Sequence, residues 1–143
     1  MTACTRSETT VRAYISALNA GDAQGAAACV SEDFVNEHAS TSGETVIGRE
    51  AYRMRLMTFL KEFRDLHYKI EDLITDGQRV AVPYVMSGNW VGPGTEGAVR
   101  RFSIRGMFRF RVEGDWISHR VDYWDAADFQ RQVWRVNDSE TGS

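Results

Sequence analysis

The sequence has few of the residues that usually bind metals. Its 143 residues include only two cysteines, Cys4 and Cys29, and three histidines. The cysteines lack the spacing of metal or redox motifs, and the histidines are scattered along the chain. We therefore expect no metal site, and nothing in the sequence indicates a cofactor.

An excess of positive charge and long apolar runs are also absent. The chain has 17 Lys and Arg against 20 Asp and Glu, for a formal net charge of -3. Nucleic-acid binding requires a clear basic excess, so no nucleic-acid partner is expected. No apolar run approaches the roughly 18 residues of a membrane helix, and the N-terminus has no apolar signal core. The sequence predicts a cytoplasmic protein that does not bind membranes.

The composition is that of an ordinary globular domain. Hydrophobic residues make up 43% of the chain and charged residues 26%, and this length fits one domain better than two. We expect a single domain over residues 1–143, with an ordered core at about 8–133 and a disordered tail at 138–143.

The apolar pattern places helices before strands. Helices are expected around Val11–Leu18, which Gly21 ends, from the capping residue Asp22 through Val30, and over Arg49–Phe63. The apolar stripe that the third helix should bury is Tyr52, Leu56, Phe59, Leu60 and Phe63. Residues 39–48 are mostly small and polar, with two glycines, and are expected to form a loop. Strands are expected at Phe34–Glu37, Leu66–Ile74, Val80–Val91, Phe102–Val112 and Trp116–Trp124, followed by a short helix, Ala126–Val133, capped by Asp125.

Helices followed by a run of antiparallel strands indicate an α+β fold, with the helices on one face of a curved sheet. Pro83 interrupts one predicted strand, which suggests that this strand lies at an edge or carries a bulge.

Several short segments, taken in order, point to one family. They are Gly48–Tyr52, Phe63–Leu66, Ile70–Ile74 with Asp76-Gly77 and Val80, Ser87–Gly92, Gly106–Phe110 with Glu113-Gly114 and Ile117, Asp122–Asp125, and Gln130 with Gln132. Over about residues 8–133 the chain resembles the SnoaL-like polyketide cyclases, which have the nuclear transport factor two-like fold. The resemblance implies a cone-shaped, curved antiparallel sheet, an α+β barrel of the cystatin-like type. Such a sheet would wrap N-terminal helices around an apolar, ligand-sized pocket.

Two sister families help to interpret the pocket. The segments Ser103–Phe108, Glu113-Gly114 and Asp122–Asp125 are similar to limonene epoxide hydrolase, and Tyr14–Asp22 is similar to the first helix of ketosteroid isomerase. In the cyclases and the hydrolases the general acid lies at the position of Asp122. The resemblance therefore implies a catalytic acid or base at Asp122.

Strand alternation adds an argument from the residues themselves. It places Asp122 on one sheet face with Trp116, Ser118, Arg120 and Trp124. A carboxyl group between tryptophans on an inward face would be desolvated, and desolvation raises its pKa. The alternative is a salt bridge from Asp122 to Arg120, which would lower the pKa and remove the acid role.

Three further residues are candidates by resemblance. Tyr14 matches the isomerase tyrosine that donates a hydrogen bond to an oxyanion, although it could equally be a core ring. His38 falls where the isomerases have their base, and its alternative is a position at the pocket rim. Asn36 matches an asparagine that holds the attacking water in the epoxide hydrolases.

The departures from these families favour a more apolar pocket. Tyr84 and Met86 stand where the hydrolases have an arginine and an aspartate, and Gly106 stands where the isomerases have a second aspartate. A hydrophobic small molecule is the expected ligand. The candidate binding residues are Asn36, Tyr84, Met86, Trp90, Phe108, Arg120 and Trp124.

Alternation also predicts an arginine-rich outer sheet face. Arg105, Arg109 and Arg111 are expected opposite Phe108. That outer face packs against a second subunit in many proteins of this fold, so a homodimer is expected. The alternative is a solvated charged face.

Three functions remain open. The first is an enzyme that transfers protons on a hydrophobic substrate, as in an aldol-type cyclisation, with Asp122 as its acid or base. The second is a non-catalytic binding protein for an apolar small ligand. The third is an epoxide hydrolase or a steroid-type isomerase.

Overall fold

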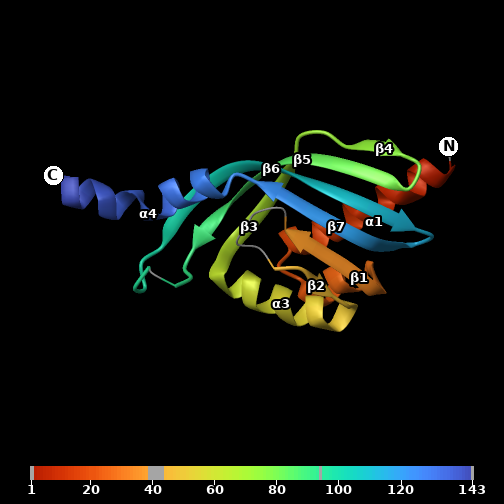
Figure 1. Cartoon of the computed structure of the whole chain (residues 1–143), viewed down its shortest axis with the longest axis horizontal. Helices are drawn as coiled ribbons and strands as arrows, with labels where there is room; N and C mark the ends of the chain where they lie inside the picture. The colour runs from red at the N-terminus through yellow and green to blue at the C-terminus, as the bar shows by residue number, and fades with distance from the viewer. Residues whose placement is uncertain (1, 39–43, 94, 143) are drawn as a thin grey trace.

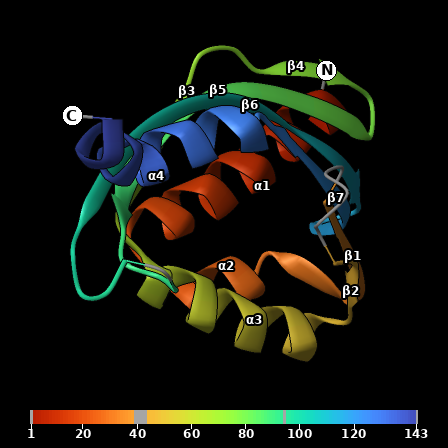
Figure 2. The ribbon, with the colours of Figure 1, turned by 60° about the vertical axis from the view of Figure 1, so that its left-hand side comes forward.

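A single curved and unclosed sheet wraps around the N-terminal helix in the computed structural model (Figures 1 and 2). The structure describes residues 2–38, 44–93 and 95–142, and within these ranges it describes side chains from Arg6 to Trp134. The helices are α1 (Thr2–Asn19), α2 (Ala23–Ala27), α3 (Arg49–Glu62) and α4 (Ala126–Gly142). The strands are β1 (Val30–His38), β2 (Val46–Ile47), β3 (Phe63–Ile70), β4 (Ile74–Asp76), β5 (Arg79–Trp90), β6 (Arg100–Glu113) and β7 (Trp116–Trp124).

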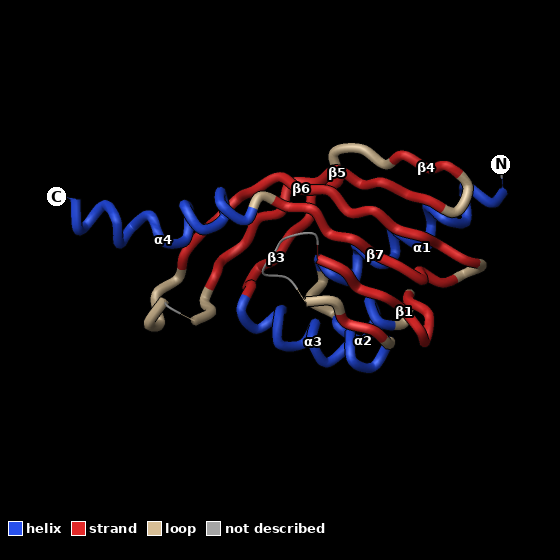
Figure 3. The backbone as a smooth tube through the Cα atoms, in the orientation of Figure 1, coloured by secondary structure: helices blue, strands red, loops and turns tan. Residues whose placement is uncertain are grey.

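The strands follow the order β2-β1-β7-β6-β5-β3, and β4 pairs with β5 outside this path. The helices α1, α2 and α3 lie on the concave side of the sheet (Figures 2 and 3). This arrangement confirms the α+β class and the curved sheet around N-terminal helices. In the part of the chain that the structure describes, no helix is long and apolar enough to cross a lipid bilayer.

Local signals explain how the first two helices join. Gly21 has a φ of 69°, the left-handed conformation that ends a helix at low cost for glycine. The Asp22 side chain then accepts a hydrogen bond from the Gly25 backbone N–H, at 2.9 Å, and caps α2. Both features agree with the sequence prediction, although α2 ends at Ala27 because Val30 already belongs to β1.

The sheet departs from the prediction at β1 and β2. β1 is parallel to β7, so the expected run of antiparallel strands is wrong for this pair. β1 also extends beyond the predicted Phe34–Glu37. Within the predicted loop 39–48, residues 39–43 lie outside the described residues, and Val46–Ile47 form the short strand β2 against β1.

Pro83 lies in an interior strand, and the expectation of an edge strand is wrong. β5 lies between β6 and β3. The Pro83 carbonyl accepts a hydrogen bond from the Glu71 N–H, at 2.9 Å, on the side away from β6. The N and the C=O of one residue point to the same side of an antiparallel strand. The missing N–H of Pro83 therefore faces the segment between β3 and β4, beyond the last β3–β5 pair, Ile70↔Tyr84, and before the β4–β5 pair Ile74↔Ala81.

Alternation in β6 follows the prediction. Phe108 is fully buried, while Arg105, Arg109 and Arg111 are exposed. The arginines therefore lie on the convex face, and the aromatic side chains of β6 form part of the core against α1.

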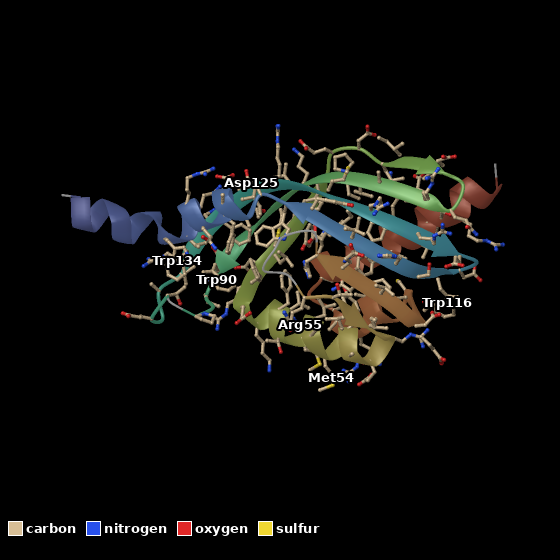
Figure 4. All side chains as sticks on the ribbon, viewed as in Figure 1. Met54, Arg55, Trp90, Trp116, Asp125 and Trp134 are labelled. Carbon is tan, nitrogen blue, oxygen red and sulfur yellow. The ribbon has the colours of Figure 1, made fainter. Side chains whose placement is uncertain are left out.

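Alternation in β7 fails near its start. The pairing with β6 shifts between Arg111↔His119 and Val112↔Ile117, so β7 has an extra residue at this point. The shift reverses the facing of the residues before it, because strand side chains alternate with a period of two. Ile117 is buried, and Trp116 is consequently exposed at the far end of the molecule from Trp90 (Figure 4). The predicted shared face of Trp116 and Asp122 is wrong.

Helix α4 runs past Val133, where the prediction ended it, and continues to Gly142. The sequence has no glycine or proline between these residues to stop the helix. Asp125 caps it as predicted, accepting a hydrogen bond from the Asp128 N–H at 2.9 Å. The Gln132 side chain bonds both the N–H and the C=O of Ser103, at 2.7 and 2.8 Å, where β6 extends beyond the end of β7. These bonds hold α4 on the sheet.

Candidate functional site

A cavity of about 190 Å³ opens between the concave face of the sheet and the helices α1 and α3. Its walls are mainly apolar and aromatic, whereas β1 and β7 contribute polar groups. The residues that line it are Leu18, Asn36, His38, Glu44, Tyr52, Arg55, Leu56, Phe59, Phe63, Tyr68, Arg120, Asp122 and Trp124. Five of the ten candidate residues are therefore in the lining: Asn36, His38, Arg120, Asp122 and Trp124.

The parallel pairing of β1 with β7 brings four of these residues together. In its register Asn36 lies beside Arg120, and His38 lies beside Asp122. Paired residues of neighbouring strands project from the same sheet face. The two pairs thus form consecutive rows at the cavity, and a sequence separation of 84 residues is bridged by direct strand contact.

Asp122 is a buried carboxyl group, 5% exposed, at the cavity wall. The Tyr84 hydroxyl donates a hydrogen bond of 2.5 Å to its Oδ1 atom. Within the described residues, no hydrogen bond to Oδ2 is found. Burial raises the pKa of Asp122, and the nearby Arg120 charge and the Tyr84 hydrogen bond, which both lower it, offset only part of this effect.

Gly106 allows Tyr84 to reach Asp122. Tyr84 and Trp124 pair with Gly106 from its two neighbouring strands. A Cβ atom on Gly106 would lie 2.5 Å from the Tyr84 hydroxyl oxygen, 2.6 Å from Cζ of the same ring and 2.7 Å from the Tyr123 carbonyl oxygen. The absence of a side chain at position 106 therefore makes room for the tyrosine that holds the carboxyl group.

Arg120 is a buried cation, 6% exposed, that also lines the cavity. Its Nε donates a hydrogen bond of 2.8 Å to the Asn36 Oδ1 atom. Its guanidinium carbon lies 5.0 Å from the Phe108 ring centre and 6.0 and 5.9 Å from those of Tyr14 and Tyr52. Among the described residues no ion pair joins it to Asp122. The salt bridge considered from the sequence is therefore absent, although the charge of Arg120 still influences that carboxyl group.

His38 is a half-buried imidazole beside Asp122. Burial lowers its pKa, and the charges of Arg120 and Arg55 lower it further, to about 4. His38 is therefore neutral at pH 7, as a residue that accepts a proton must be. The histidines His67 and His119 lie outside the cavity, and His119 contacts Glu37 at 3.1 Å.

Tyr14 lies beneath the cavity and not in its lining. Its hydroxyl is hydrogen-bonded to the Tyr52 hydroxyl, which lies in the lining. Burial raises the pKa of both tyrosines, so both are neutral at pH 7. Any effect of Tyr14 on a ligand would therefore pass through Tyr52.

The remaining candidates surround the cavity without lining it. Tyr84 is buried and hydrogen-bonded to Asp122, and Phe108 is buried under Arg120. Met86 is buried in the core, where it pairs with Tyr68 and Ile104 of the neighbouring strands. Trp90 packs against Phe63, with ring centres 4.8 Å apart. These residues shape the site indirectly.

Sequence reasoning missed Tyr52, Tyr68 and the pair of Arg55 with Glu44, which are joined at 2.9 Å. Tyr52 could have been predicted as a lining residue, because it belongs to the apolar stripe predicted for α3 and such a stripe faces the enclosed side of the sheet. Figure 4 shows Arg55 above α3, on the side that faces the sheet. Groups of three or more potential metal ligands are not found in the ranges that the structure describes.

Comparison with known proteins identifies the family. A model of the SnoaL-like domain matches residues 11–120, so the chain belongs to the SnoaL-like domain family. No match was found among curated proteins.

Solved structures show the same fold. A polyketide cyclase candidate from Xanthomonas campestris pv. campestris is 24% identical, with a TM-score of 0.77, and the match covers 92% of this chain and 98% of that one. A SnoaL-like polyketide cyclase candidate from Jannaschia sp. CCS1 is 16% identical, with a TM-score of 0.79 and coverages of 90% and 92%. A protein with a ketosteroid isomerase-like fold from Catenulispora acidiphila, in complex with trimethylamine, is 19% identical, with a TM-score of 0.76 and coverages of 87% and 91%.

Proposed function

We propose that the protein is a cofactor-independent enzyme that transfers a proton on a small organic molecule, with Asp122 as its acid and base. The observation that carries this proposal is the state of Asp122. It is a buried carboxyl group in a cavity wall, with one oxygen held by Tyr84 and, among the described residues, no hydrogen bond to the other. Burial raises the pKa of Asp122, so that this carboxyl group is a stronger base than an exposed aspartate and can accept a proton in one step and return it in a later one.

An aldol-type ring closure can be written with these residues. Asp122 takes a proton from a carbon next to a substrate carbonyl, and the C–H electron pair becomes an enolate. The enolate carbon attacks a second carbonyl of the same molecule, which forms a C–C bond and leaves an alkoxide. Asp122 then returns its proton to the alkoxide, so the substrate is isomerised and the enzyme is restored. The positive charge of Arg120 favours both anionic intermediates.

The comparisons support this reaction type, because two of the three structural neighbours described above are polyketide cyclase candidates. A ligand-binding protein is the second proposal. The lining favours this second proposal. Among the described residues, its one carboxyl group besides Asp122 is that of Glu44, which is largely exposed and paired with Arg55. Epoxide hydrolysis and steroid isomerisation, the third possibility, would need the second carboxyl group that those families have at the positions of Met86 and Gly106.

Deuterium exchange tests the proposal without knowledge of the substrate. We expect the protein to accelerate exchange of the α-hydrogens of 2-tetralone, an apolar bicyclic ketone, in D₂O. The exchange rate should saturate with ketone concentration and should rise with pH as Asp122 loses its proton. Proton NMR measures it. Saturable quenching of tryptophan fluorescence without accelerated exchange would instead support the binding protein.

We also propose a homodimer that forms through the outer sheet face. Exposed arginines alternate there with the partly buried Met107, and Tyr123 is exposed beside it on β7. Long side chains that carry both apolar stems and charges are common at such interfaces. Light scattering at tens of micromolar protein should give twice the mass of the chain, and Met107→Glu should reduce it. A monomeric wild-type protein would contradict the proposal.

A further inference from the structure

We propose that the cavity selects an organic carboxylate with an apolar body, whose carboxylate group pairs with Arg120. This inference rests on the proposed function in one respect, since it names the ligand class of the same site. Its basis is the combination of a buried, unpaired cation with apolar walls around it.

Arg120 lacks the partner that a buried cation usually has. A buried charge is normally paired, because its transfer from water is costly without an opposite charge. Among the residues that the structure describes, Arg120 makes one side-chain hydrogen bond, from Nε to the neutral amide of Asn36. In the described part of the chain, no ion pair and no hydrogen bond is found for Nη1 or Nη2. These donors remain for a ligand.

The neighbouring groups do not neutralise this charge. Tyr14, Tyr52 and Tyr68 have raised pKa values because of burial and are neutral, and the lowered pKa of His38 leaves it neutral as well. At the cavity mouth Arg55 and Glu44 neutralise each other.

Asp122 is the remaining opposite charge, and it is held by Tyr84. Burial makes it bind its proton more strongly than an exposed aspartate does. When Asp122 is protonated, the enclosed part of the site has a net positive charge, from Arg120.

The shape and charge of the cavity favour a carboxylate over a phosphate. One enclosed cation matches one negative charge, and the planar guanidinium fork matches the two oxygens of a carboxylate. The body of the ligand would lie against Leu18, Leu56, Phe59, Phe63 and Trp124. A volume of about 190 Å³ restricts that body to a small ring system.

Binding should also be linked to protonation of Asp122. A carboxylate at Arg120 compensates the positive charge that lowers the pKa of Asp122, and it brings a negative charge close to the same group. Both effects favour protonated Asp122. The ligand should therefore bind with uptake of a proton, and its affinity should fall as the pH rises through the pKa of Asp122.

Calorimetry with 2-naphthoate and its neutral analogue 2-naphthamide tests the inference. In wild-type protein at pH 6, we expect naphthoate to bind at least about tenfold more tightly than naphthamide, since a charge-assisted pair replaces a neutral contact. Titrations in two buffers of different ionisation heat should show proton uptake with naphthoate only. Naphthamide binding as tightly as naphthoate, or no naphthoate binding at millimolar concentration, would overturn the inference.

Two variants locate the effect. Arg120→Met should remove the preference for naphthoate and retain naphthamide binding. The double variant Arg55→Met/Glu44→Gln is the matched control, because it removes the cation of the cavity mouth together with its partner and keeps the net charge there unchanged. It should retain the preference. A preference that persists in Arg120→Met and is lost in the double variant would place the anion at the mouth and overturn the assignment. If Arg120→Met does not fold, the double variant still decides, because Arg55 is the other arginine in the described lining.

The result is separable from the fate of the proposed function. Naphthoate preference without accelerated exchange of 2-tetralone would leave a carboxylate-binding protein and remove the enzyme. Accelerated exchange without that preference would leave the enzyme and remove the inference.

Discussion

Asp122→Asn is expected to lower the rate of 2-tetralone exchange by about 10²- to 10⁴-fold, the usual contribution of a positioned general base. The amide can still accept the Tyr84 hydrogen bond, but it cannot take a proton from carbon. Affinity for 2-tetralone should change little, because the lost interaction belongs to the transition state. NMR exchange rates and fluorescence titrations of the same samples measure the two effects.

The pH dependence provides the control for this variant. Wild-type exchange should rise with pH through the pKa of Asp122, whereas the residual exchange of Asp122→Asn should lack this step. A raised pKa means that ionisation of Asp122 costs the folded state free energy, so the wild type loses stability as the pH rises through that pKa. The variant should therefore be at least as resistant to urea as the wild type at pH 8. A variant that exchanges at the wild-type rate would exclude Asp122 as the base.

The sequence predicted best what depends on local patterns. Gly21 and the capping residues Asp22 and Asp125 act within a few residues of their position, and the structure contains all three features. The inward facing of Phe108 follows from simple alternation along an undisturbed strand. The family resemblance added one correct prediction that is not local, the curved sheet around N-terminal helices.

The errors arise where distant segments meet. The parallel pairing of β1 with β7 joins residues 84 positions apart, and no local pattern specifies it. The irregularity at the start of β7 moves Trp116 to the opposite face, and an alternation rule has no means to locate an extra residue. The sequence predicted a desolvated Asp122 because it placed this residue between Trp116 and Trp124. Asp122 is buried, but its surroundings include Tyr84 and Arg120 and exclude Trp116.

Tyr84 illustrates the same limit at the site. From the sequence it was a candidate for ligand contact at a position where related hydrolases have a charged residue. In the structure it is hydrogen-bonded to Asp122 from behind the cavity wall. The role depends on Gly106, which lies opposite it on β6 and leaves space for the ring. Neither residue indicates this role alone.

Gly106→Ala tests that dependence and is expected to destabilise the protein by about 3 kcal/mol, at the upper end of overpacking costs. The new Cβ would meet the Tyr84 ring at 2.5 and 2.6 Å and the Tyr123 carbonyl oxygen at 2.7 Å. The tyrosine can move only by leaving Asp122, and the backbone oxygen belongs to the sheet. Urea unfolding at pH 7 measures the loss of stability.

The pKa of Asp122 distinguishes displacement of Tyr84 from a general loss of packing. The Tyr84 hydrogen bond lowers this pKa, so Gly106→Ala should raise it further, as should Tyr84→Phe, which removes the hydroxyl without adding a clash. Carbon NMR of the Asp122 carboxyl group measures the titration. Gly88→Ala is the matched control in the same strand as Tyr84. A Cβ atom on Gly88 would lie 3.0 Å from the Arg64 carbonyl oxygen, and Gly88 pairs with Phe102, away from Asp122. This variant should therefore leave the titration of Asp122 unchanged. If Gly106→Ala unfolds at the wild-type urea concentration with an unchanged Asp122 titration, the Tyr84 ring does not depend on the space at Gly106.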